Sequence, residues 1–149
     1  MESAAQLARS AKLLDARAAA DPVAMRLMSV PGVGPIIALT FKSSIEDSGR
    51  FSRSVDAGAY AGLVPRRNQS GMRDHKGHIT KAGDPMLRSA LYEAANSVLV
   101  RLKRPCALQR WGQKLADTKG PKRAKVAVAR KLAALLHKLW QSETEFCWN

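Results

Sequence analysis

DPMLRSALYEAANSVLVR, residues 84–101, contains the strongest helix signal in the chain. Asp84 suits an N-cap, and Pro85 suits the first helical position, where the missing N–H of proline costs no hydrogen bond. The apolar residues that follow recur at the 3.6-residue period of an α-helix and form one stripe: Leu87, Leu91, Ala94, Val98 and Leu102. We therefore predict a helix from Asp84 to about Arg101 that buries this stripe.

A second amphipathic helix is predicted over Lys122–Gln141, opened by Gly120-Pro121. Its apolar stripe consists of Val128, Leu132, Leu135 and Leu139. The opposite, outward face is predicted to carry Arg123, Arg130, Lys131, His137 and Lys138. Because each helix has one apolar stripe, we expect the two helices to pack against each other through these stripes.

Shorter helices are predicted elsewhere along the chain. Ser3–Ala20 is an alanine-rich helix that buries little by itself, and it resembles the end of a coiled coil that leans on a partner. Asp21-Pro22 repeats the cap-plus-proline signal and starts a short helix. Further short helices are predicted over Asp56–Gly62 and around Trp111 and Leu115.

These elements predict a mainly α fold, because no stretch of convincing length has the alternating pattern of a strand. The predicted architecture is a compact helical domain with a helix-hairpin-helix-like element and a central ordered loop, preceded by a coiled-coil-like N-terminal helix. The loop covers Leu63–Gly83, with a short hairpin from Ser70 to Ile79 as one interpretation. We divide the chain into residues 1–21, the end of a coiled-coil or linker helix, residues 22–141, one domain, and residues 142–149, a tail.

The composition indicates a polyanion as partner. The 149 residues hold 25 Lys and Arg against 12 Asp and Glu, a formal net charge of +13. A field of this sign attracts nucleic acid, whereas solubility alone needs a smaller net charge. Twelve of the basic residues lie within Arg101–Lys138 with a single acid, Asp117, so the charge is also concentrated locally.

Several protein classes are excluded by the same composition. Cys106 and Cys147 are too few for a disulfide framework and lack the spacing of metal ligands. The longest apolar stretch, around Val33–Phe41, is too short to cross a bilayer, and the first residues lack the pattern of a signal peptide. We therefore expect a cytoplasmic protein with no membrane partner, and no cofactor or metal bound by this chain.

The turn Val30-Pro31-Gly32-Val33-Gly34-Pro35, followed by a helix, resembles the hairpin of helix-hairpin-helix proteins. The first N–H groups of a helix have no partner inside it, and they can receive a DNA phosphate where glycine lets the backbone come close. Gly32 and Gly34 are therefore candidate phosphate-binding residues. The alternative is a plain turn between helices, which needs the same glycines.

The other candidate nucleic-acid-binding residues come from the central loop and the two long helices: Arg66, Arg67, Arg73, Lys76, Lys81, Arg88, Lys122, Arg123, Arg130 and Lys131. Ser70 lies among the loop members of this set, whose positive charge would stabilise a phosphodiester under attack. A serine before glycine is ordinarily a turn residue, and no histidine–carboxylate pair with obvious spacing is present to activate it. The residues alone thus leave Ser70 open between a turn role and a catalytic one.

Several motifs together resemble the C-terminal domain of transposases of insertion-sequence family one-ten, also named after members one-sixteen and nine-oh-two. They occur in order along residues 22–140: RLMSVPGVGP (26–35), YAGLVPRR (60–67), QSG (69–71), GHITKAGD (77–84) and AVARKLA (127–133). The resemblance implies that residues 22–141 form a domain that binds DNA during transposition of a mobile element. It also implies that Ser70 becomes joined covalently to DNA during strand exchange.

The same resemblance implies partners and a second domain. Full-length family members join an N-terminal nuclease-like domain, with an acidic metal-binding quartet, to this domain through a coiled coil, and some are guided by a structured RNA. The implied partners are DNA, a structured guide RNA and full-length transposase subunits, with the divalent metal confined to the nuclease domain.

This sequence holds no such quartet, so we expect a truncated copy, a decayed copy or one half of a split protein, inactive as an isolated recombinase. The alternative function is that of a stand-alone, non-catalytic helix-hairpin-helix protein that binds nucleic acid. An acidic nuclease segment encoded just upstream would favour the transposase, and its absence would favour the stand-alone protein.

Overall fold

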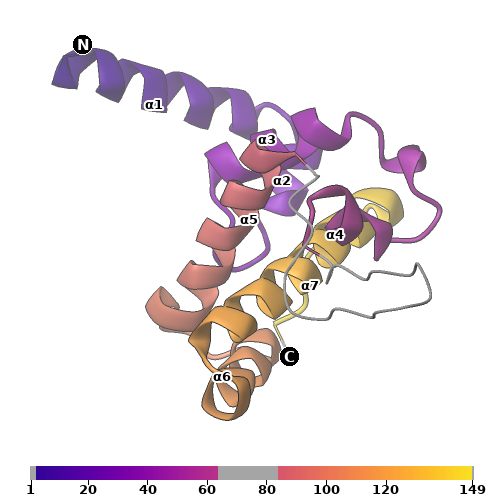
Figure 1. Cartoon of the computed structure of the whole chain (residues 1–149). Coiled ribbons are helices and arrows are strands. Elements are labelled where there is room, and N and C mark those ends of the chain that lie inside the picture. Colours follow the sequence, from indigo (N-terminus) through magenta and orange to yellow (C-terminus); the bar gives the residue numbers. More distant parts are fainter. Residues whose placement is uncertain (1–2, 64–83, 149) are drawn as a thin grey trace.

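The structure, a computed structural model, describes residues 3–63 and 84–148. Within these ranges every regular element is helical, which confirms the predicted mainly α fold (Figure 1). In chain order the helices are α1 (Ala4–Ala19), α2 (Pro22–Leu27), α3 (Pro35–Ile45), the 3-10 turn η1 (Ser48–Arg50), α4 (Asp56–Tyr60), α5 (Pro85–Asn96) with its π-helical continuation η2 (Ser97–Arg101), α6 (Ala107–Lys119) and α7 (Pro121–Ser142). Apart from Leu63, the predicted central loop lies outside the described residues.

Helix α7 is the centre of the domain, and α2, α4, α5 and α6 all pack against it (Figure 1). The apolar stripe predicted for α5 and its continuation is buried at its first four members, Leu87, Leu91, Ala94 and Val98. On α7, the stripe is buried at Val128, Leu132 and Leu139 and partly buried at Leu135. The predicted packing of these two helices through their apolar stripes is therefore confirmed.

The prediction that His137 faces outward is wrong. Its side chain is fully buried, and its ring meets Phe51 edge-on with the ring centroids 5.7 Å apart. Nδ1 lies 2.9 Å from the hydroxyl of Ser54, and Nε2 lies 2.7 Å from the carbonyl oxygen of Ser48. Since a carbonyl only accepts, Nε2 donates to Ser48 and Nδ1 accepts from Ser54. The segment between α3 and α4 covers this side of α7, so the buried face of the helix is wider than one stripe.

Helix α6 is longer than the short helix predicted around Trp111, and it packs closely on α7. Gly112 lies at the contact, where an added Cβ would be 2.6 Å from Cδ2 of Leu99 and 2.7 Å from Cγ2 of Val128. Favourable contacts between carbon atoms need about 3.5–4.0 Å. The glycine therefore allows α6, η2 and α7 to approach one another this closely.

Helix α1 reaches away from the other helices (Figure 1). Its one buried residue is Ala18, while Leu7 and Leu13 are 57% and 72% exposed. The helix itself is therefore confirmed over nearly the predicted range. A partner for its exposed side stays a prediction.

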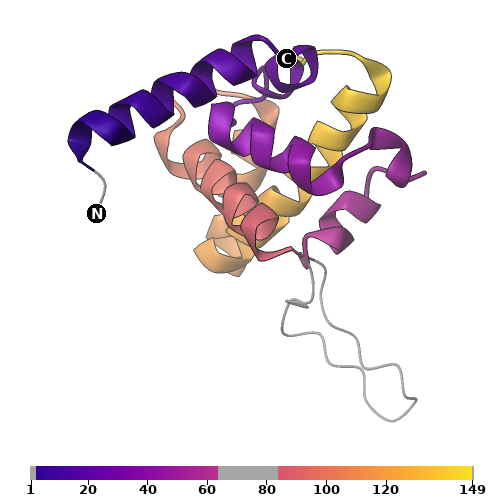
Figure 2. The same ribbon diagram turned by 90° about the horizontal axis from the view of Figure 1, so that it is seen from above.

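The tail predicted after residue 141 folds back onto the domain as far as it is described. The N–H of Phe146 donates to the hydroxyl of Ser29 over 2.9 Å, and the Phe146 ring packs against the core. The guanidinium of Arg104 lies 4.1 Å from the ring centroid of Trp148. These contacts bring Phe146 beside the turn that follows α2, and the end of the chain toward the start of α6 (Figures 1 and 2).

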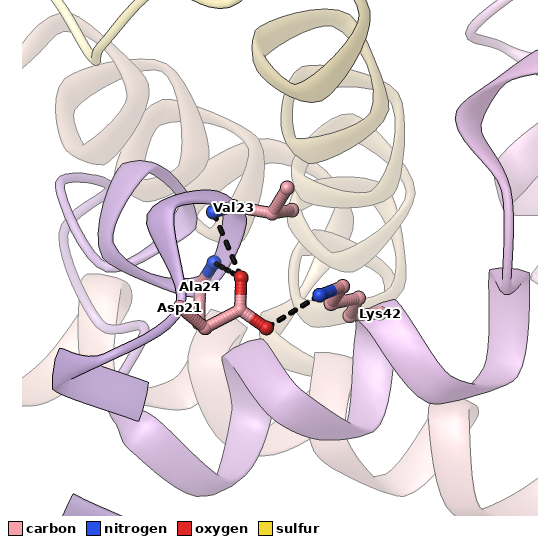
Figure 3. Close-up of polar contacts among 4 residues, drawn as sticks. All are labelled: Asp21, Val23, Ala24 and Lys42. Atoms are coloured by element: carbon pink, nitrogen blue, oxygen red, sulfur yellow. Dashed lines mark hydrogen bonds and ion pairs between the residues drawn. The ribbon is translucent and has the colours of Figure 1, made fainter. Parts of the chain in front are cut away.

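Asp21 caps α2, as predicted, and also ties it to α3 (Figure 3). Its carboxylate accepts hydrogen bonds from the amides of Val23 at 2.9 Å and Ala24 at 3.2 Å, and it pairs with the ammonium of Lys42. Burial by itself would raise the pKa of Asp21, but the hydrogen bonds from Lys42 and the two amides outweigh it. The pKa of Asp21 therefore lies below its usual value.

Asp84 has the same function for α5. Its carboxylate accepts from the amides of Met86 at 3.0 Å and Leu87 at 3.3 Å. A hydrogen bond with Ser44 of α3 is the main reason that the pKa of Asp84 lies below its usual value. The N–H of Asp84 also donates to the carbonyl of Tyr60 over 3.4 Å, so this residue joins α3, α4 and α5.

Acid is expected to weaken the fold through these two carboxylates. Each folded-state pKa lies below the unfolded value of about 3.9, so the stabilisation is present above that pH and is lost as the pH falls through the folded-state pKa. Asp21→Asn still caps α2 but cannot form the ion pair with Lys42. Its free energy of unfolding should therefore fall less than that of wild type between about pH 5 and about pH 2. Urea unfolding at both pH values measures this, and an equal fall in the two proteins would contradict the role given to Asp21.

Candidate nucleic-acid interface

The turn between α2 and α3 holds the two glycines predicted to bind phosphate. Gly32 has a φ of +84° and lies against α5, where an added Cβ would be 2.7 Å from the carbonyl oxygen of Ala94. Gly34 caps α3 with an extended backbone, and a Cβ added there would meet nothing within 4 Å. The conformation and the packing of the turn therefore require a glycine at position 32. At position 34 the space that a side chain would take is empty. Phosphate binding by these glycines, and with it the helix-hairpin-helix likeness, stays a prediction.

Five exposed basic residues lie along α6 and in the first turn of α7, a stretch that also holds one exposed acid, Asp117. The basic residues, which we name the α6–α7 basic surface, are Arg110, Lys114, Lys119, Lys122 and Arg123. Within the described ranges, salt bridges join Asp21 to Lys42 and Asp56 to Arg53, and none involves these five cations. Lys122 and Arg123, which were predicted to bind nucleic acid, belong to this surface. No salt bridge in the described part of the chain neutralises its cations, so they can pair with phosphates.

Arg130 and Lys131, also predicted, lie beside an open groove of about 740 Å³ between α4, α6 and α7, which we name the α4–α7 groove. The ammonium of Lys131 lies 4.2 Å from the ring centroid of Trp111 on α6. The stem of Arg130 packs on Gly58 of α4, where an added Cβ would be 2.9 Å from Cγ of the arginine. Because Gly58 has no side chain, α4 can lie close to α7 beside Arg130, and the groove lies next to this contact.

Three groove residues, Arg53, Asp56 and Trp111, were not among the predicted site residues. Arg53 and Asp56 form an ion pair at 2.9 Å at the α4 side of the groove. Trp111 follows Arg110 directly in a basic helix, and this aromatic residue among cations is the signal that could have indicated a nucleic-acid contact. No comparable signal marks Arg53, because its position depends on how α4 packs on α7.

The described chain on either side of residues 64–83 converges at the end of α4. The N–H of Leu63 donates to the carbonyl of Gly58 over 3.0 Å, and Asp84 bonds to Tyr60 as described above. Arg88, predicted to bind nucleic acid, is half-buried with its guanidinium 3.5 Å from the carbonyl oxygen of Ala61. The remaining predicted residues lie outside the described residues: Ser70, Arg66, Arg67, Arg73, Lys76 and Lys81.

Among residues 3–63 and 84–148, no group of three or more His, Cys, Asp or Glu is placed to hold a metal ion. Nor does the described part contain a helix with the length and apolar character needed to span a membrane.

Known proteins similar to this chain are transposases and a gene-inverting protein. The model of the transposase IS116/IS110/IS902 family matches residues 24–111, more than half of the chain.

The transposase for insertion sequence element IS1111A of Coxiella burnetii is 36% identical over 136 residues, which are 90% of this chain and 37% of that protein. A family 20 transposase of Pseudomonas aeruginosa is 33% identical over 141 residues, 94% of this chain and 42% of its own length. The pilin gene-inverting protein of Moraxella bovis is 31% identical over 122 residues, 80% of this chain and 37% of its own length. The chain thus spans less than half the length of each of these relatives.

Proposed function

The chain belongs to the transposase IS116/IS110/IS902 family, and from this premise we propose that it is the domain of such a transposase that binds DNA during transposition of an insertion sequence. The observation that supports this most is the α6–α7 basic surface, whose five exposed cations form no salt bridge in the described part of the chain. Lysine and arginine on such a surface contact phosphates, which gives affinity and position without reading sequence. We therefore expect weak binding of duplex DNA with little sequence preference.

Ser70 is the residue that we propose joins this domain to DNA. The support is the family resemblance around QSG at 69–71, together with the basic residues close to it in sequence. The Oγ of Ser70 would form a bond to the phosphorus while the bond from phosphorus to one sugar oxygen breaks, and the serine proton would pass to that released sugar oxygen. The strand would then stay attached to the protein until a sugar hydroxyl attacks the phosphoserine and returns the proton to Ser70. Arg66 and Arg67 would stabilise the negative charge that develops on the phosphate. The divalent metal would be held by the nuclease-like domain of full-length family members.

The proposal includes two further partners. A structured guide RNA presents the same phosphate charge as DNA, so the α6–α7 basic surface suits both nucleic acids. Full-length transposase subunits are the second partner, and contact with them would cover the exposed apolar side chains of Leu7 and Leu13 on α1. As a family member with these partners, the chain would form the C-terminal domain of a cytoplasmic recombinase.

The salt dependence of DNA binding tests the role of the α6–α7 basic surface. Each phosphate that a cation neutralises adds about 0.9 to the magnitude of the slope of log affinity against log salt. The double variant Lys122→Ala/Arg123→Ala should therefore bind more weakly, with a slope smaller in magnitude by about 2. Fluorescence anisotropy of a labelled duplex, measured at several salt concentrations, gives the slope.

The matched control removes the same charge from α1, which packs on α2 and α3 and lies away from α6 (Figure 1). Arg9→Ala/Lys12→Ala should leave the slope unchanged. Equal losses in the two double variants would show that net charge alone governs binding. A flat salt response of the wild-type protein would contradict phosphate binding altogether.

A further inference from the structure

We propose that the α4–α7 groove receives one unstacked nucleobase of a nucleic-acid strand, with the phosphates beside that base held by Arg130 and Lys131. The inference rests on the proposed function, nucleic-acid binding, and it names a subsite that the α6–α7 basic surface does not provide. Three features of the groove support it: its shape, its aromatic wall and the charge along its rim.

The interior of the groove is apolar. Its lining includes Val55 and Ala59 from the α4 side, Ala127 and Ala134 from α7, and Trp111 from α6. Val55 is 59% exposed, so its side chain is accessible to an occupant of the groove. A volume of about 740 Å³ lies within the range of small-molecule pockets, which combine an apolar lining with a few polar groups. The occupant is therefore expected to present a flat, largely apolar group.

Trp111 supplies the surface on which a base stacks. At present the ammonium of Lys131 covers the indole, 4.2 Å from the ring centroid. An exposed cation–π contact is weaker than the stacking of a base on an aromatic side chain. A base that stacks on Trp111 therefore replaces the weaker contact and frees the ammonium of Lys131 to pair with the adjoining phosphate.

The charge of the rim selects an anionic occupant. Arg53, Arg130 and Lys131 line the groove with one acid, Asp56, and that acid is paired with Arg53 at 2.9 Å. The rim therefore keeps two positive charges in excess, which disfavours a neutral apolar ligand. An apolar interior with an aromatic wall and a cationic rim matches a nucleotide, which carries a flat base next to a phosphate.

The test compares two strands of equal charge, a twelve-residue thymidine oligonucleotide and an abasic deoxyribose-phosphate strand of the same length. The full chain should bind the thymidine strand about tenfold more tightly, because only that strand can stack on Trp111. Trp111→Ala should remove this preference. Trp148→Ala, the matched control, should keep it, because Trp148 also lies under a cation, Arg104, but outside the groove.

A second variant keeps the test decisive if Trp111→Ala fails to fold. Ala134→Leu fills the groove without changing any charge or aromatic residue, and it should also abolish the preference while circular dichroism shows an unchanged helix content. Equal binding of both strands by wild type, or a preference that survives Ala134→Leu, would overturn the inference and leave nucleic-acid binding standing. Binding of neither strand, nor of duplex DNA, would overturn the proposed function itself.

Discussion

Gly32→Ala is expected to destabilise the protein by about 2–5 kcal/mol, the sum of a left-handed backbone conformation forced on alanine and a clash inside a packed contact. The φ of Gly32 is +84°, and the added Cβ would be 2.7 Å from the carbonyl oxygen of Ala94. That oxygen belongs to the backbone of α5, so it cannot move aside as the end of a side chain would. The turn must therefore shift away from α5, or the contact between them is lost.

Gly34→Ala is the matched control, two residues away in the same turn. Its φ is −96° and its added Cβ would meet nothing within 4 Å, so its free energy of unfolding should change by less than about 1 kcal/mol. Urea unfolding followed by circular dichroism measures both variants. Equal stability losses at the two positions would contradict the packing role of Gly32. A loss of DNA affinity in Gly34→Ala without loss of stability would support its predicted phosphate contact.

Local signals predicted the helices well, because each depends on residues close in sequence. The aspartate-proline pairs at Asp21 and Asp84 mark helix starts that the structure reproduces, since a cap and a proline act within one turn. The apolar period of Leu87, Leu91 and their neighbours likewise predicts a buried face without knowledge of its partner.

Features that depend on packing between distant segments were not predictable in this way. His137 looked like an outward polar residue, yet the segment around Ser48 and Ser54 covers it and satisfies both ring nitrogens. Gly112, a helix-weakening residue by propensity, is explained only by the closeness of η2 and α7. The same holds for the α4–α7 groove: Arg130 and Lys131 were predicted individually and Arg53 was not, and their arrangement around Trp111 arises from three packed helices.

Ser70→Ala is expected to abolish the covalent protein–DNA intermediate while leaving salt-dependent DNA binding nearly intact. One hydroxyl contributes little to a contact made through many phosphates, but no other group is proposed to attack the phosphodiester. Arg66→Ala and Arg67→Ala should instead weaken both binding and adduct formation, because their charge acts on the DNA before and during attack. Because the metal is proposed to be held by the nuclease-like domain of full-length family members, the assay includes that domain, fused or added, with its DNA and RNA.

The measurement that tests the transposase function most directly is a denaturing gel of end-labelled DNA after reaction in this reconstituted system. Wild type and Ser52→Ala, a control at an exposed serine before α4, should both produce a labelled band retarded by the mass of the protein and removed by protease. Ser70→Ala should produce none. An adduct that persists in Ser70→Ala would contradict the proposed role of this serine and leave it as a residue of a turn.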